Sequence, residues 1–498
     1  MHALLIYPEF PDTFWSFRHA LKFVGRRAVS PPLGLLTIAP MLPEAWEKRL
    51  VDLNVRPLTE ADLAWADIAL VSAMTVQQDS AREVLARCRE AGVRTVVGGP
   101  LFSTEPDSFA DEVDHQVLGE AEITLAPFLA DLAEGRAKGL YTTDDHPELD
   151  RTPTPAWELA DLKHYDSMPL QFSRGCPFNC DFCNVTALLG HRPRTKSAGQ
   201  IIAELEALYV AGWRRSVFFV DDNFIGNKRV LKEELLPALI AWRKSKPGLT
   251  RRGLPFNTEV SINLADDEEL VTLMLEAGFN KVFIGIETPD DESLAECGKS
   301  QNRRRDMLAD VKKLHRAGIG VQAGFIVGFD SDTPTTFQRQ IAFIQQSGIV
   351  TAMVGLLQAP AGTALYERLR EEGRLLGESI GNNVDVVTNV LPKMGMDVLR
   401  GGYRQIMAHI YSPRYFTERV KTFLGDYQMP KVASPLTWVE MRAFVRSIYV
   451  LGIRDRERRY YWELVLWTLL RRPALLPLAV TMAIYGYHFR TITAANIL

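Results

Sequence analysis

Three cysteines lie close together in the stretch Arg174-Gly-Cys-Pro-Phe-Asn-Cys-Asp-Phe-Cys183. Their spacing is CxxxCxxC, and the whole chain of 498 residues has only five cysteines. Three thiolates on a short loop can bind three irons of a cubane iron–sulfur cluster, which normally has four cysteine ligands. The fourth iron is then open to a substrate or cofactor. A structural zinc site is the alternative, but it requires four ligands, and only His191 lies nearby in the sequence.

This stretch resembles the signature of the radical S-adenosylmethionine (SAM) enzymes, in which an aromatic residue such as Phe182 precedes the third cysteine. The resemblance implies a [4Fe–4S] cluster on Cys176, Cys180 and Cys183. It implies that SAM binds the open iron and that its reductive cleavage yields a 5′-deoxyadenosyl radical. It also implies an external electron donor of the flavodoxin or ferredoxin type.

The length of the chain predicts two to four domains. A net charge of −4 gives no reason to expect nucleic-acid binding. Few, clustered cysteines favour a reducing cytoplasm. The N-terminus has the pattern of a first strand, without the features of a signal peptide. The longest apolar run, Pro473–Tyr487, is shorter than the roughly 20 residues that span a bilayer, so we predict no membrane-spanning helix.

The N-terminal third alternates short apolar strands with helical stretches, which predicts an α/β domain with a parallel sheet. The predicted strands are Ala3–Tyr7, Arg49–Asp52, Ile68–Ser72, Thr95–Val97 and His115–Leu118. We expect a Rossmann-like, flavodoxin-like domain over residues 1–140 and a proline-rich linker over 141–168. Ligands of such sheets bind at the carboxyl ends of the strands.

The domain resembles the cobalamin-binding domain that precedes many radical SAM enzymes. That domain has the motifs DxHxxG, SxL and GG; this chain has Ser72-Ala-Met74 and Gly98-Gly99, but Asp52-Leu-Asn54 carries Asn54 in place of the cobalt-binding histidine. The resemblance implies base-off cobalamin without a histidine ligand. Implied contacts are Asn54, Ser72, Met74, Thr75, Gln77, Gly98, Gly99, Gly119 and Glu120, and Thr75 and Gln77 are the candidates for the lower ligand of cobalt. A flavodoxin-like sheet without cobalamin is the alternative.

The middle of the chain repeats a strand and a helix six times. The predicted strands are Leu170–Ser173, Ser216–Val220, Phe256–Val260, Lys281–Ile286, Val321–Val327 and Ala352–Leu357. Radical SAM enzymes fold as a partial (β/α)₆ barrel, which we expect over residues 169–378. Its chemistry should lie at the carboxyl ends of the strands.

Polar residues and glycines follow these strands. By resemblance, they contact SAM: the set is Asp221, Asp222, Glu259, Ser261, Glu287, Gly324 and Gly328. The alternative for each acid is a helix N-cap, although Glu259 lies within a predicted strand. The sequence does not identify a general acid or base. Neither Cys88 nor Cys297 belongs to a second cysteine cluster, so a second iron–sulfur cluster is not expected.

Residues 379–498 are predicted to be mostly helical. The segment resembles the C-terminal domain of a subgroup of cobalamin-dependent radical SAM proteins that includes the hopanoid 2-methylases. Its last two helices are apolar, with Trp462, Trp467 and several arginines nearby. They could form a lid packed on the barrel or an amphipathic surface for a peripheral membrane contact or lipid.

The resemblance therefore implies a cobalamin-dependent radical SAM methyltransferase. It would methylate an unactivated carbon of a small molecule through the 5′-deoxyadenosyl radical and methylcobalamin. A polycyclic lipid such as a hopanoid is the specific hypothesis. Alternatives are a radical SAM cyclase or rearrangement enzyme that uses cobalamin without methyl transfer, and a non-enzymatic sensor. The sequence does not define the oligomeric state.

Overall fold

The computed structural model describes residues 1–498 except 247–248, 250–252, 380, 383 and 430–437. Its N-terminal part contains one sheet of parallel strands in the order β2-β1-β3-β4-β5-β6. This order is flavodoxin-like, so the predicted Rossmann-like fold is confirmed. The strands are β1 (His2–Tyr7), β2 (Glu47–Asp52), β3 (Ile68–Ser72), β4 (Arg94–Gly98), β5 (His115–Val117) and β6 (Leu140–Tyr141).

Helices cover both faces of this sheet because successive strand residues point to opposite sides. Ala69 and Val71 of β3 join one apolar cluster, whereas Ile68 and Leu70 join another. The first cluster includes residues of α3 (Glu60–Trp65), α4 (Gln78–Glu90) and α5 (Pro100–Thr104), and the second includes residues of α6 (Ala121–Ala133).

The second sheet is a parallel half-barrel in the order β14-β13-β12-β11-β10-β7, which confirms the predicted partial (β/α)₆ barrel. Its strands are β7 (Ser167–Leu170), β10 (Ser216–Phe219), β11 (Phe256–Val260), β12 (Phe279–Glu287), β13 (Gly320–Val327) and β14 (Ala352–Leu356). The helices between them include α8 (Ala198–Val210), α10 (Leu236–Ser245), α12 (Glu268–Ala277), α14 (Met307–Ala317) and α15 (Pro334–Ser347).

The first barrel strand was predicted over Leu170–Ser173, and that prediction is wrong. The strand ends at Leu170 because the backbone N–H groups of Phe172 and Ser173 donate to the buried Asp221 carboxylate. The chain then enters a short antiparallel hairpin of β8 (Ser173–Arg174) and β9 (Arg194–Thr195). The loop of this hairpin carries the three clustered cysteines and α7 (Val185–Leu189).

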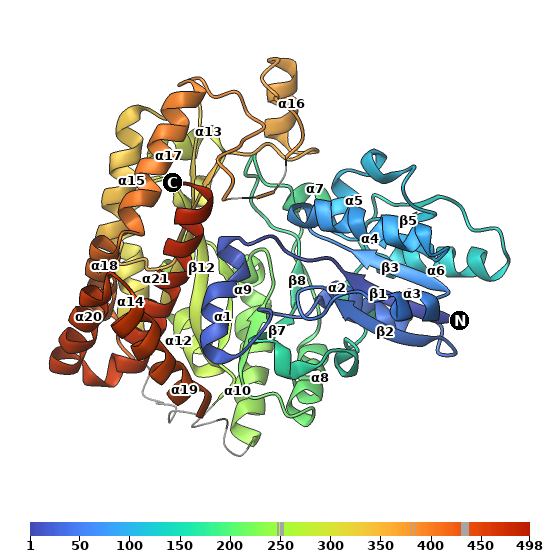
Figure 1. The fold of residues 1–498 in the computed structure, drawn as a ribbon, viewed down its shortest axis with the longest axis horizontal. Coiled ribbons are helices and arrows are strands. Elements are labelled where there is room, and N and C mark those ends of the chain that lie inside the picture. Colours follow the sequence, from blue (N-terminus) through green and yellow to red (C-terminus); the bar gives the residue numbers. More distant parts are fainter. Residues whose placement is uncertain (247–248, 250–252, 380, 383, 430–437) are drawn as a thin grey trace.

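Helices follow the barrel, and the N-terminal segment packs against them (Figure 1). The segment after β1 forms α1 (Arg18–Val24), which contacts α19 and α21. Phe14 and Phe17 from this segment contact Phe489 of α21. The helical elements are α16 (Ala364–Glu371), α17 (Met396–Ile410), α18 (Pro413–Asp426), α19 (Trp438–Ser447), η12 (Ile448–Arg454), α20 (Arg458–Arg471) and α21 (Leu476–Asn496).

The last helix, α21, begins at Leu476 inside the apolar run Pro473–Tyr487 and continues to Asn496, and eight of its 21 residues are buried. Its residues Ala479, Phe489 and Ile492 belong to the same apolar cluster as the barrel core. Among the described residues, no helix is both long enough and apolar enough to span a membrane.

Candidate functional site

The cysteine loop is held tightly between two other segments. Gly175 has a φ of +91°, and a Cβ atom there would lie within 3.0 Å of the carbonyl oxygens of Leu189, Gly190 and Arg192. The backbone N–H of Cys176 donates to the Gly190 carbonyl at 3.3 Å. Glycine is therefore required at position 175, where the chain approaches another backbone closely.

The segment Cys297–Gln301 forms the second wall. The Asp181 N–H donates to the Cys297 carbonyl at 3.1 Å, and a Cβ atom on Gly298 would lie 2.7 Å from the Asn179 carbonyl oxygen. These contacts place Gln301 against the loop, where its amide Nε2 donates to Cys180 Sγ at 4.0 Å.

Cys176, Cys180 and Cys183 are free thiols with partial exposure. Burial raises the pKa of each of them, that of Cys183 to about 12, so the thiols are neutral unless metal displaces their protons. Free, partly exposed thiols on one loop, with a hydrogen-bond donor at one sulfur, fit a cluster with three protein ligands. In the described part of the chain, no three His, Cys, Asp or Glu side chains converge on a single metal ion. Thiolates that bind different irons of a cluster are farther apart than ligands of one ion.

Asp221 and Asp222 follow β10 but have different surroundings. Asp221 is fully buried and accepts from the Ser173 hydroxyl at 2.5 Å as well as from two backbone N–H groups, so it fixes the start of the cysteine loop. Burial nevertheless raises its pKa to about 7. Asp222 has a buried Oδ2 atom without a hydrogen-bond partner among the described residues. Burial raises the pKa of Asp222 to about 6.

Glu259 lies in β11, and no hydrogen bond or ion pair is found for its carboxyl group within the described residues. Burial, and then the nearby Asp222 and Asp221, raise its pKa to about 8. Two neighbouring carboxyl groups that are incompletely paired and have raised pKa values are typical of a functional site. Both could accept hydrogen bonds from a cationic or hydroxyl-bearing ligand.

Glu287 ends β12 in a strained conformation. Its φ is +62°, and the strand register shifts between Gly285 and Glu287. The carboxylate pairs with Lys299 at 2.7 Å, and both side chains are about nine-tenths buried. A Cβ atom on Gly285 would meet this pair, at 2.3 Å from Glu287 Oε1 and 2.7 Å from Lys299 Nζ. Burial lowers the pKa of Lys299, but Glu287 and Cys180 raise it by more, which keeps the ammonium charged beside the cysteines.

The other predicted barrel residues line the same edge. Asn223 fixes the position of Ser261, because the Ser261 N–H donates to Asn223 Oδ1 at 3.1 Å. Gly324 faces Phe283, whose ring would lie 3.2 Å from an added Cβ atom. Gly328 has a φ of +114° and donates its N–H to Asp332.

Phe182 contacts Phe329 with ring centroids 6.3 Å apart, so it packs at the rim of the barrel.

In the N-terminal sheet, the predicted glycines allow the strands to approach one another closely at the carboxyl edge. A Cβ atom on Gly99, which has a φ of +90°, would lie 2.4 Å from Ser72 Oγ. One on Gly98 would lie 2.7 Å from the Val117 carbonyl oxygen. The close approach of β3, β4 and β5 here therefore depends on residues without side chains, which fits the backbone-lined groove that a large cofactor needs.

Asn54 and Gln77 both bind the backbone that follows β1. Asn54 accepts from the Phe10 N–H at 2.8 Å and donates to the Pro8 carbonyl and the Asp52 carboxylate. Gln77, which is buried, donates to the same Pro8 carbonyl and accepts from the Met74 N–H. Their polar atoms are thus already engaged within the protein.

Met74 is 45% exposed, and Thr75 lies against Gly381, whose added Cβ atom would be 3.2 Å from the Thr75 Cβ atom. The loop after β3 is therefore in contact with the segment that follows the barrel.

Glu120 belongs to a buried ion cluster that joins the two sheets. Its carboxylate pairs with Arg174 at 2.6 Å and with Arg194 at 2.6 Å, which are the residues that flank the cysteine loop. Glu122 pairs with Arg174 at 2.9 Å. The preceding Gly119 has a φ of +76° and supplies the turn that directs these acids toward the barrel.

Sequence reasoning did not identify Arg174, Arg194, Lys299 or Gln301 as site residues. Arg174 and Arg194 lie on either side of the cysteine loop in the sequence, and this position could have identified them. Lys299 and Gln301 are more than 110 positions from the loop, and no sequence pattern pointed to them.

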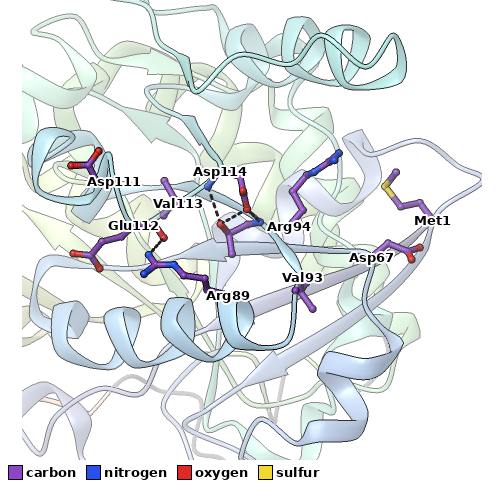
Figure 2. A pocket seen from close by; sticks show the side chains of 11 residues that line it. Met1, Asp67, Arg89, Val93, Arg94, Asp111, Glu112, Val113 and Asp114 are labelled. Carbon is purple, nitrogen blue, oxygen red and sulfur yellow. Dashed lines mark hydrogen bonds between the residues drawn. The ribbon is translucent and has the colours of Figure 1, made fainter.

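An open cavity of about 850 Å³ lies at the opposite, amino-terminal edge of the first sheet (Figure 2). Some of its polar groups bind each other: Asp114 accepts from the N–H and hydroxyl of Thr95, and Arg89 donates to the Glu112 carbonyl. Because ligands of such sheets bind at the carboxyl edge, we assign no function to this cavity.

Family models match three regions of the chain: a B12 binding domain at residues 25–129, the radical SAM superfamily at 170–344, and a domain of unknown function at 363–497. An uncharacterized methyltransferase of Synechocystis sp. is 41% identical over 98% of this chain and 91% of the relative. The hopanoid C-2 methylase of Rhodopseudomonas palustris is 34% identical over 94% of this chain and 89% of that protein. The chain belongs to the cobalamin-dependent radical SAM methyltransferases.

The structure of the radical SAM methyltransferase TsrM from Kitasatospora setae, with cobalamin and a [4Fe–4S] cluster bound, has the same fold. It superposes with a TM-score of 0.60 over 74% of this chain and 78% of that chain, at 18% identity. Membership of the cobalamin-dependent radical SAM methyltransferases confirms the predicted cofactors, a [4Fe–4S] cluster, SAM and cobalamin.

Proposed function

We propose that the protein methylates an unactivated carbon of an apolar polycyclic lipid of the hopanoid class. The similarity to a hopanoid C-2 methylase extends over nearly the whole chain, including the C-terminal helices. The structural observation that carries the proposal is the position of the cysteine loop. It extends from a hairpin whose two arginines bind Glu120, at the carboxyl edge of the first sheet.

When bound, the cluster and SAM supply the 5′-deoxyadenosyl radical, and cobalamin carries the methyl group. The chain's own residues position these groups and exclude water from between them. Cys176, Cys180 and Cys183 would be the cluster ligands. Their loop is fixed by Gly175 and by the backbone of Cys297.

Several barrel residues would orient SAM. Asp222 and Glu259 have carboxyl oxygens without protein partners and would accept hydrogen bonds from its amino and hydroxyl groups. Ser261 and Glu287 lie at neighbouring strand ends, and the backbone at Gly324 and Gly328 would pack against the adenine.

The cobalamin groove would be formed by Ser72, Met74, Thr75, Gly98 and Gly99. Asn54, Gln77 and Glu120 would shape that groove without contacting cobalt, because their polar atoms already bind the protein.

An aromatic pair supports an apolar acceptor. Phe283 lies two residues from Gly285 in β12, on the strand face that carries the Glu287–Lys299 pair. Trp15, from the segment after β1, contacts Phe283 with ring centroids 5.2 Å apart and is 43% exposed. We infer that both rings contact the acceptor. Electrons would come from an external flavodoxin- or ferredoxin-type donor, and a lipid acceptor would be met at a membrane surface.

The test is an anaerobic assay with reconstituted cluster, cobalamin, SAM, a reductant and a hopanoid extract. We expect a hopanoid product heavier by one methyl group. Cys180→Ala should abolish this product and lower the iron content. Cys88→Ala is the matched control, because Cys88 is a buried thiol of α4 that packs in the first sheet's core. Deoxyadenosine formation without methyl gain by the wild-type protein would refute the proposal.

A further inference from the structure

Exposed apolar side chains are concentrated in one part of the C-terminal region. Twenty-one large hydrophobic side chains are exposed among the described residues, and ten of them lie between Trp438 and Leu470. This segment makes up less than a tenth of the chain, so the concentration exceeds the scattered exposure of single apolar residues that is normal for protein surfaces.

Within α19 and η12, the exposed residues share one side. Met441, Val445, Tyr449 and Ile453 recur every four positions and are 41%, 62%, 54% and 59% exposed. This spacing places them along one side of a helix. The opposite side, with Ala443, Ser447 and Leu451, is buried against the rest of the domain.

A second stripe runs along α20, which packs against η12. The exposed residues Trp462, Leu466, Leu469 and Leu470 are spaced by four, three and one positions, whereas Tyr461, Leu464, Val465 and Thr468 are buried. The Trp462 indole donates to the Gly452 carbonyl at 2.9 Å, which joins the two stripes at one end. We refer to the eight exposed residues as the apolar face: Met441, Val445, Tyr449, Ile453, Trp462, Leu466, Leu469 and Leu470.

Basic residues occur along the same helices as the apolar face. Eight arginines and four acidic residues occur between Trp438 and Arg472, which gives this segment a net charge of +4 in a chain whose net charge is −4. Seven of these arginines are exposed: Arg442, Arg446, Arg454, Arg456, Arg458, Arg459 and Arg471. The Arg454 guanidinium lies over the Tyr449 ring, so charge and apolar surface adjoin.

Two of the four acids are paired with cations from outside the segment. Asp455 binds Arg490, and Glu463 binds Lys421. These pairs partly neutralise the acids and leave the excess positive charge on the arginines. Apolar residues bordered by exposed arginines are the combination that inserts into the interface of a membrane with anionic lipids.

We propose that the apolar face of α19, η12 and α20 docks on an anionic lipid membrane. This inference rests on the proposed function, since it gives the enzyme direct access to a lipid acceptor. It places the membrane contact on α19, η12 and α20, whereas residues of α21 pack in the barrel core.

The test is cosedimentation of the full-length, cluster-loaded protein with vesicles of phosphatidylcholine alone or with phosphatidylglycerol added. We expect binding only to the anionic vesicles, and weaker binding as salt is raised. Val445→Glu and Leu470→Glu should each weaken binding about tenfold, since each loses an inserted apolar side chain and adds a negative charge. Val210→Glu is the matched control: Val210 of α8 is 77% exposed and far from this segment in the sequence, and the change should leave binding intact.

Binding that is equal on neutral and anionic vesicles, or unchanged in Val445→Glu and Leu470→Glu, would overturn the proposal. A second copy of the chain is the other occupant to test. If the protein alone is a dimer by sedimentation and the two variants are monomers, the face is a dimer interface and the membrane proposal fails. Retained iron content and circular dichroism in the variants would show that they are folded.

The same preparations separate this inference from the proposed function. Lipid methylation in detergent without vesicle binding would contradict only the docking surface. Binding to anionic vesicles without methylation of any hopanoid would contradict only the proposed substrate.

Discussion

The carboxyl group of Glu259 makes folding dependent on pH. Its pKa is raised from 4.5 to about 8 by burial and by Asp222 and Asp221, so the folded protein holds this proton over a range in which the unfolded chain has lost it. The free energy of unfolding should therefore fall as the pH rises from about 4.5 to about 8. For this group the loss is on the order of a few kcal/mol.

Glu259→Gln should remove that part of the pH dependence. Urea denaturation of the SAM-free protein at about pH 5.5 and about pH 8 would measure it. We expect the stability of the variant to fall less than that of the wild type between these pH values. An identical fall in both proteins would contradict the assignment of this carboxyl to a desolvated site.

Lys299 should set the reduction potential of the cluster. Its ammonium group is close enough to Cys180 and Cys183 to interact with their charges, and a nearby positive charge favours addition of an electron. Lys299→Gln should lower the midpoint potential on the order of 50 mV, or about tenfold in the reduction equilibrium. Lys299→Arg should retain the wild-type value.

An EPR-monitored redox titration of reconstituted protein would measure both variants, with iron content as the check on cluster assembly. Equal midpoint potentials in Lys299→Gln and the wild type would show that this charge does not act on the cluster.

Trp15 should affect acceptor binding and not SAM cleavage. Trp15→Ala removes an aromatic contact with Phe283 and should raise the KM for the lipid about tenfold. Trp15→Phe should restore most of it. The rate of 5′-deoxyadenosine formation without acceptor should stay the same. An unchanged KM in Trp15→Ala would exclude Trp15 from the acceptor site.

At the scale of elements, the hairpin of β8 and β9 is attached to the first sheet by buried charges. Glu120 is 4% exposed and binds two arginines, so Glu120→Gln leaves those cations incompletely compensated. We expect a loss of 3–5 kcal/mol in the free energy of unfolding, approximately, and lower iron incorporation.

Glu148→Gln is the control for this prediction. Glu148 pairs with Arg192 of the same hairpin loop, but both side chains are more than half exposed, so its loss should cost less than about 1 kcal/mol. Urea denaturation and iron analysis of both variants would test the difference. Equal effects of the two changes would contradict a structural role for the buried cluster.

Apart from β6 and β7, the strands of both sheets were predictable because their apolar runs end in glycines and polar residues. The role of Glu120 could not be predicted from the sequence. A Gly-Glu pair after a parallel strand predicts a ligand edge, but the sequence does not indicate whether the carboxylate points into the groove or toward a neighbouring domain. Similarly, Asn54 was expected to contact cobalamin because it occupies the histidine position, and only the structure shows its bonds to Pro8 and Phe10.

At the scale of the whole molecule, the chain returns on itself in a way that no local pattern predicts. The segment from Phe14 to Val24 leaves the first sheet and packs on α19 and α21, more than 400 positions away. Phe14, Phe17, Leu21 and Val24 recur at helical spacing, which predicts an apolar face. The spacing does not indicate which distant elements cover that face. This crossing brings Trp15 to the barrel.

The central claim is that the protein methylates a carbon of a lipid and uses SAM in two ways, as the methyl donor and as the source of the radical. The most direct measurement uses SAM with a deuterated methyl group in the anaerobic hopanoid assay and quantifies three products by mass spectrometry. The account predicts a lipid carrying the labelled methyl, with S-adenosylhomocysteine and 5′-deoxyadenosine formed in similar amounts. Labelled lipid without 5′-deoxyadenosine, or 5′-deoxyadenosine with an unlabelled lipid, would contradict it.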